Sequence, residues 1–128
     1  MILDRDLIMK AVDLPHEDVE IPEWGGTVRV RTMTGSERDA WEQGLFDDKG
    51  KIRRAKDIRA SFLVLCLIDG EGNRIFKDAD IPLLGKKSSL VLDRLFTVAQ
   101  RLNGLGKKDI EDLEKNLEDG QKDNSISG

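Results

Sequence analysis

Residues 19–41 of the chain read VEIPEWGGTVRVRTMTGSERDAW and pass from an extended segment through a turn into the start of a helix. The segment before Pro22 has the pattern of a strand end, because proline lacks the N–H that a central ladder requires. Gly25-Gly26 can take the positive φ values of a tight two-residue turn. The stretch therefore predicts a β-hairpin, followed directly by a helix.

The second strand of this hairpin alternates in character. Val28, Val30 and Thr32 alternate with Arg29 and Arg31, which is the two-residue period of a strand with one buried face. We therefore expect the valines to pack inward. Arg29 and Arg31 are expected to be exposed on the opposite face, where they would contact a partner.

The segment TGSERDAWEQGLF predicts a helix from about residue 36 to residue 46. Thr34 or Ser36 can cap its N-terminus, and the acidic residues of its first turn complement the helix dipole. One side of this helix is expected to carry Ala40, Trp41 and Leu45.

Apolar spacing predicts further helices at residues 52–68, 88–102 and 109–117. The first has the widest apolar surface, including Phe62 and Leu65, and belongs at the centre of the core. Between the first two we expect a short strand at residues 74–76 and a short turn of helix capped by Asp80. The fold class is thus α+β, with a small N-terminal β-hairpin or sheet packed against a bundle of about four to five helices.

The length of 128 residues fits one domain, which we place at residues 1–117. Residues 1–17 form an N-terminal arm that is either a short helix or a packed extended segment. Residues 118–128 read as a disordered polar tail. The longest uncharged apolar run, residues 60–68, is far shorter than the ~20 residues of a membrane span. The single cysteine, Cys66, lies in that run as a buried free thiol, so we expect a soluble protein of a reducing cytoplasm.

Charge is unevenly distributed along the chain. Residues 1–48 carry a net charge of −7, residues 49–108 carry +8 and residues 109–128 carry −5. This segregation suits either docking onto a charged protein or faces whose signs interleave in the folded chain. The run KGKIRRAKDIR at residues 49–59 is the most basic stretch, but an overall pI near 5.1 argues against a nucleic-acid partner.

No pattern predicts catalysis, a cofactor or a metal. Residues 69–80 begin like a calcium loop, but Arg74 occupies the position that needs glycine and Asp80 replaces the bidentate glutamate. His16 is the only histidine, so neither a general base for the serines nor a second imidazole ligand is at hand. We therefore expect a plain turn at 69–80 and a protein that is not an enzyme.

Three stretches together carry a resemblance to a known family: VEIPEWGGTVRVRTMTGSERDAWE, then LVLCLIDGEGNRIFKDADIPLLGKKSSLVLDRLFTVAQRLNGL, then DIEDLEKN. In order and spacing, the chain resembles the tail assembly chaperones of long-tailed, siphovirus-type bacteriophages and prophages. The resemblance covers about residues 18–117, which is most of the chain. The first 17 residues and the end of the chain lie outside it.

The resemblance implies a non-enzymatic α+β adaptor made in the host bacterial cytoplasm. Members bind the tape measure protein, keep it soluble and promote assembly of the tail tube, and they are not retained in the virion. A longer frameshifted form, self-association and contact with the major tail tube protein belong to the same expectation. The alternative is a generic cytoplasmic interaction or scaffolding module. A small nucleic-acid-binding regulator is the second, less favoured alternative.

The resemblance identifies no binding residues, so these are chosen from residue type and predicted exposure. Tryptophan and arginine dominate protein interfaces, and the basic run is the strongest electrostatic feature. The expected partner-binding residues are Trp24, Arg29, Arg31, Trp41, Arg53, Arg54 and Lys56.

Overall fold

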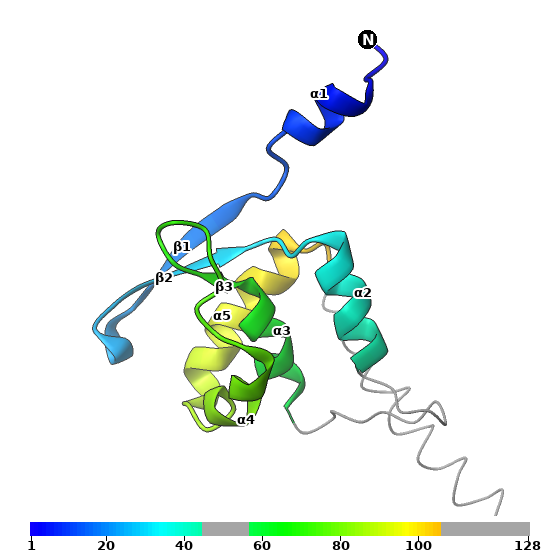
Figure 1. The fold of residues 1–128 in the computed structure, drawn as a ribbon. Helices are drawn as coiled ribbons and strands as arrows, with labels where there is room; N and C mark the ends of the chain where they lie inside the picture. The colour runs from blue at the N-terminus through cyan, green and yellow to red at the C-terminus, as the bar shows by residue number, and fades with distance from the viewer. Residues whose placement is uncertain (45–56, 106–128) are drawn as a thin grey trace, which may run out of the picture.

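A computed structural model of the chain describes residues 1–44 and 57–105 (Figure 1). Its elements are α1 (Arg5–Lys10), β1 (His16–Ile21), the 3₁₀ turn η1 (Pro22–Trp24), β2 (Gly26–Arg31), α2 (Gly35–Gly44), α3 (Ile58–Cys66), β3 (Leu67–Ile68), the 3₁₀ turn η2 (Asp78–Asp80), α4 (Ile81–Leu84) and α5 (Ser89–Leu102). The strands form one antiparallel sheet in the order β1-β2-β3. The predicted α+β class is confirmed.

The predicted hairpin is present, but its turn is longer than expected. Ile21 pairs with Gly26, so Gly26 already belongs to β2 and the two strands are joined by Pro22–Gly25. Proline suits the first position of the 3₁₀ turn because its φ is fixed near the helical value. Gly25 alone leaves that turn with a positive φ of 77°. The prediction of a two-residue Gly25-Gly26 turn is therefore wrong.

α3 lies at the centre of the molecule, between β3, α2, α4 and α5 (Figure 1). Every residue of α3 except Arg59 is buried, which confirms a central helix within the predicted range of 52–68. Residues 52–56 of that prediction lie outside the described residues. Its C-terminal boundary is different from the prediction, because Leu67 and Ile68 leave the helix and pair with Val30 and Arg29 of β2. Pairing with β2 satisfies the backbone N–H and C=O groups of these two residues. The helical periodicity of the sequence does not reveal that a strand lies beside them.

α5 confirms the predicted helix at residues 88–102, with Ser88 at its N-cap position. It packs on α3 and across β1 and β2, so its apolar side closes the core. The buried residues of that side are Val91, Leu92, Leu95, Phe96 and Ala99. No helix in residues 1–44 and 57–105 is long and apolar enough to cross a membrane.

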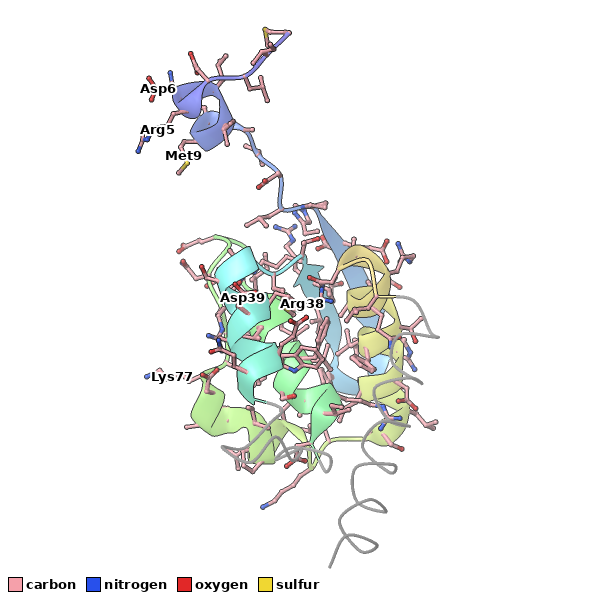
Figure 2. The ribbon with its side chains drawn as sticks, turned by 90° about the vertical axis from the view of Figure 1, so that its right-hand side faces the viewer. Arg5, Asp6, Met9, Arg38, Asp39 and Lys77 are labelled. Atoms are coloured by element: carbon pink, nitrogen blue, oxygen red, sulfur yellow. The ribbon has the colours of Figure 1, made fainter. Side chains whose placement is uncertain are left out.

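The N-terminal arm contains a short helix, one of the two forms that the sequence left open. Asp4 caps α1 by accepting a hydrogen bond from the Leu7 N–H at 2.9 Å. None of the six residues of α1 is buried, and the helix stands clear of the other helices and strands that the structure describes, with Arg5, Asp6 and Met9 projecting away from them (Figures 1 and 2).

Three local expectations need correction. Ala40 is exposed, because only Trp41 on that part of α2 turns toward the core. Asp80 occupies the N-cap position of α4 as predicted, but its carboxylate makes no hydrogen bond to α4 and instead accepts the Lys77 N–H at 2.8 Å, which closes η2. The strand predicted at residues 74–76 is reduced to one bridge between Arg74 and Ile68. The predicted helix at 109–117 and the tail at 118–128 lie outside the described residues.

Candidate partner-binding surface

Arg29 lies on β2 directly opposite Asp18 of β1 and forms a two-pronged ion pair with it. Arg29 Nε donates to Asp18 Oδ1 at 2.7 Å, and Arg29 Nη2 donates to Asp18 Oδ2 at 3.0 Å. The hydrogen bond from Arg29 lowers the pKa of the Asp18 carboxyl below its ordinary value. Both side chains remain accessible, at 33% and 46%, so the pair lies on the surface as the alternation predicted for Arg29.

Arg31 is buried, with only 9% of the residue exposed, so the expectation that it faces solvent is wrong. The start of α2 and the end of α3 provide acceptors for its guanidinium at this end of β2. Its Nη2 donates to Glu37 Oε2 at 2.8 Å and to the Leu65 carbonyl oxygen at 3.1 Å. Within the described residues, its Nε has no hydrogen-bond partner.

The contact with Leu65 gives Arg31 a structural role. The last carbonyl groups of a helix have no partner inside that helix and carry the negative end of its dipole. At the end of α3, the Val64 carbonyl accepts a hydrogen bond from Arg74 Nε at 3.0 Å and the Leu65 carbonyl accepts one from Arg31. Two arginines from other segments thus cap the C-terminus of the central helix.

Glu37 links this cap to the start of α2. Its Oε1 accepts the Thr34 N–H at 2.8 Å, while Thr34 Oγ1 accepts the Glu37 N–H at 3.1 Å, a reciprocal capping box. Burial opposes ionisation of the carboxyl, but the hydrogen bonds from Thr34 and Arg31 outweigh it, and the pKa of Glu37 is lowered. Thr34, the first of the two predicted caps, is the one used.

The two tryptophans have different environments. Trp41 is 4% exposed, and its Nε1 donates a hydrogen bond to Ser61 Oγ at 3.0 Å. Its ring packs edge-on against the ring of Phe62, with the two ring centroids 5.0 Å apart. It is a core residue in this structure rather than a surface anchor. Trp24 is 36% exposed at the tip of the hairpin. The other predicted contacts, Arg53, Arg54 and Lys56, lie outside the described residues.

Trp24 borders a shallow hollow of about 510 Å³ between η1 and α4, which we call the η1–α4 groove. Its floor and walls are mainly apolar, and one acidic and one basic residue stand beside them. The lining residues are Glu23, Trp24, Phe76, Leu83, Leu84 and Lys87. The hollow is the described surface feature best suited to hold apolar side chains of a partner.

The sequence analysis selected Trp24, which lines the η1–α4 groove, but it did not select Leu83 or Phe76, which also line it. The signal for Leu83 was present in the segment IPLLG. In a short helix that starts near Pro82, Ile81 and Leu84 are three residues apart and share the inward face, which leaves Leu83 outside. Ile81 and Leu84 are buried, whereas Leu83 is 61% exposed.

The charged segments partly interleave in the folded chain. Arg94 of α5 donates to both carboxylate oxygens of Glu23, at 3.1 and 2.7 Å, and Arg101 donates to Glu17 at 2.7 Å. Acidic residues of β1 and η1 thus meet basic residues of α5. For these residues, charge segregation along the sequence reflects pairing within the chain.

Comparison with known proteins places this fold. The family model described as phage tail assembly chaperone matches residues 5–116, and so includes α1, which lay outside the resemblance seen in the sequence. The solved structure of the bacteriophage HK97 tail assembly chaperone has the same fold, with 22% identity and a TM-score of 0.55 over 70% of this chain and 85% of that chain. No curated protein sequence matches the chain. Since the family model spans most of its length, the chain belongs to the phage tail assembly chaperone family.

Proposed function

We propose that this chain binds the tape measure protein of its phage, keeps it soluble in the host cytoplasm and promotes assembly of the tail tube around it. In this proposal the chain is not retained in the virion, and the major tail tube protein is a second partner. The observation that carries the proposal is the family match over residues 5–116.

The described surface supports a binding role. A chaperone has to present apolar surface to its client while remaining folded, and contiguous apolar surface commonly marks an interaction site. The η1–α4 groove provides such a surface beside the half-exposed Trp24. The chain's one thiol is a poor nucleophile, because burial raises the pKa of Cys66 to about 12.

The test is co-expression of the tape measure protein with and without this chain, both from the same phage. The expected result is that the tape measure protein precipitates alone, but remains soluble and co-purifies with the chain. A tape measure protein that is equally soluble with and without the chain, and never co-purifies with it, contradicts the proposal. Electrophoresis of both fractions gives the measurement.

A further inference from the structure

The η1–α4 groove brings exposed apolar side chains together instead of scattering them. Leu84 is 3% exposed and, with Phe76, forms a floor continuous with the core. Trp24 and Leu83 border it and remain 36% and 61% exposed. Folded proteins expose single apolar side chains routinely, but a shared hollow of this size matches the pockets that receive ligand side chains.

Both borders of the groove are held in place before any partner arrives. η1 is tied to α5 by the two hydrogen bonds from Arg94 to Glu23, and its turn is closed by the Gly25 N–H donating to the Pro22 carbonyl at 3.0 Å. α4 begins at the closed turn of Asp80. A preformed site loses little conformational entropy on binding, so its apolar contacts are more fully available for affinity.

Among the described residues, no strand lines the groove: its lining residues lie in η1, in α4, between β3 and η2 and just after α4. The N–H groups of Gly85, Lys86 and Lys87 already donate to carbonyls of α4, at 3.0 to 3.2 Å. Strand addition depends on free backbone groups at a sheet edge, whereas a helix docks through its side chains alone. The groove therefore suits a helix rather than an extended peptide.

Charges at the sides of the groove define the rest of the partner's chemistry. The hydrogen bond from Arg94, followed by one from its own backbone, lowers the pKa of Glu23 to about 2, so Glu23 is ionised at neutral pH and its charge is balanced by Arg94. Lys87 provides a cation among the other lining residues. A helix with an apolar stripe and acidic residues along the flank that faces Lys87 complements the groove.

We propose that the η1–α4 groove binds an amphipathic helix of the tape measure protein, whose apolar stripe packs between Trp24 and Leu83. This inference rests on the proposed function and assigns it to one surface. Acidic residues flanking the stripe face Lys87.

The test compares two exposed leucines. Leu83→Glu places a charge in the groove, whereas Leu90→Glu makes the same change at a leucine that is 74% exposed and does not line it. Each variant is co-expressed with the tape measure protein, and the captured amount is measured against wild type. We expect Leu83→Glu to reduce capture about tenfold or more, as loss of a central apolar anchor does, and Leu90→Glu to leave it unchanged. Circular dichroism of each purified variant confirms folding. Trp24→Ala removes the opposite wall of the groove and is an independent test of the same surface.

The outcomes separate this inference from the proposed function. If wild type captures the tape measure protein and both Leu83→Glu and Trp24→Ala capture it equally well, the groove assignment fails while the proposed function stands. If wild type captures nothing, the proposed function fails and the groove assignment fails with it. If Leu83→Glu changes only the concentration dependence of self-association in sedimentation, the groove binds a second copy of the chain, which also overturns the inference.

Discussion

Arg31 and Arg29 provide a matched comparison between a buried and an exposed ion pair on one strand. Both lie on the same face of β2, and each donates to a carboxylate at 2.7 to 2.8 Å. They differ in burial: the side chains of the Arg31–Glu37 pair are 11% and 20% exposed, against 33% and 46% for Arg29 and Asp18. We predict that Arg31→Met destabilises the fold far more than Arg29→Met does.

The magnitude follows from what each substitution removes. Arg31→Met leaves the Leu65 carbonyl without its donor and Glu37 without its cation, and breaking a fully buried pair in this way costs about 3–5 kcal/mol. Because Glu37 is one-fifth exposed and keeps its hydrogen bond from Thr34, we expect a smaller loss, about 2–4 kcal/mol. Arg29→Met removes a surface pair, which contributes about 0–1 kcal/mol.

Urea titration followed by far-ultraviolet circular dichroism measures both free energies of unfolding. The slope of the transition must be unchanged for the comparison to hold, because a changed slope signals an altered denatured state or loss of two-state behaviour. Equal stabilities of the two variants, within about 0.5 kcal/mol, would refute the role of Arg31 as a cap of α3. The same result would restore the expectation that both arginines lie free on the surface.

Three further predictions concern other parts of the chain. Deleting residues 1–14 should change the urea midpoint very little, because α1 buries nothing; a loss above about 1 kcal/mol would show that the arm packs on the domain. Phe62→Ala should cost about 3–5 kcal/mol in the same assay, since the ring is fully buried between Trp41 and Phe96, and an unchanged midpoint would place it outside the core. The pKa of Glu37 is lowered from 4.5, so its ionised form stabilises the fold at neutral pH, and this contribution is lost as the pH falls below 4.5 through the folded-state pKa. Urea titrations between about pH 7 and about pH 3 should therefore show a smaller acid loss for Glu37→Gln than for wild type, and identical losses would contradict the assignment.

Sequence periodicity predicted those helices and strands whose position depends mainly on burying their own apolar side chains. The alternation at residues 28–32 predicted a strand and the apolar stripe at residues 88–102 predicted a helix, and both elements are present as β2 and α5. Val30 is fully buried, as its place in the alternation required. The stripe of α5 reports burial directly, because its apolar residues share one face of the helix and meet the same core.

The failures arose where a distant segment decided the outcome. Leu67 fits a helical stripe but pairs with Val30 because β2 offers an open edge there. Arg31 has the alternation of an exposed residue, but Glu37 and the end of α3 surround it. The groove likewise joins η1 to α4, segments more than fifty residues apart, and no local pattern records that meeting.

The exposure of the candidate binding residues was predictable only in part. Arg29 and Trp24 are exposed as a surface role requires, whereas Trp41 fills the core beside Phe62. Residue type is a weak guide here because tryptophan is equally suited to a core and to an interface. Because Arg31 binds Glu37 and the end of α3, replacing Arg29 and Arg31 together by glutamate would damage the fold, so Arg29→Glu alone is the sound test of that face.

Hydrogen–deuterium exchange of the full chain, alone and saturated with the tape measure protein, tests the central claim most directly. The account predicts slower exchange on binding for the backbone N–H groups of residues 23–25, 81 and 83–87, which frame the groove. The first turn of α5, which carries Leu90, should exchange at the same rate in both states. Unchanged exchange at residues 23–25, 81 and 83–87, with protection confined to other segments, would contradict the account.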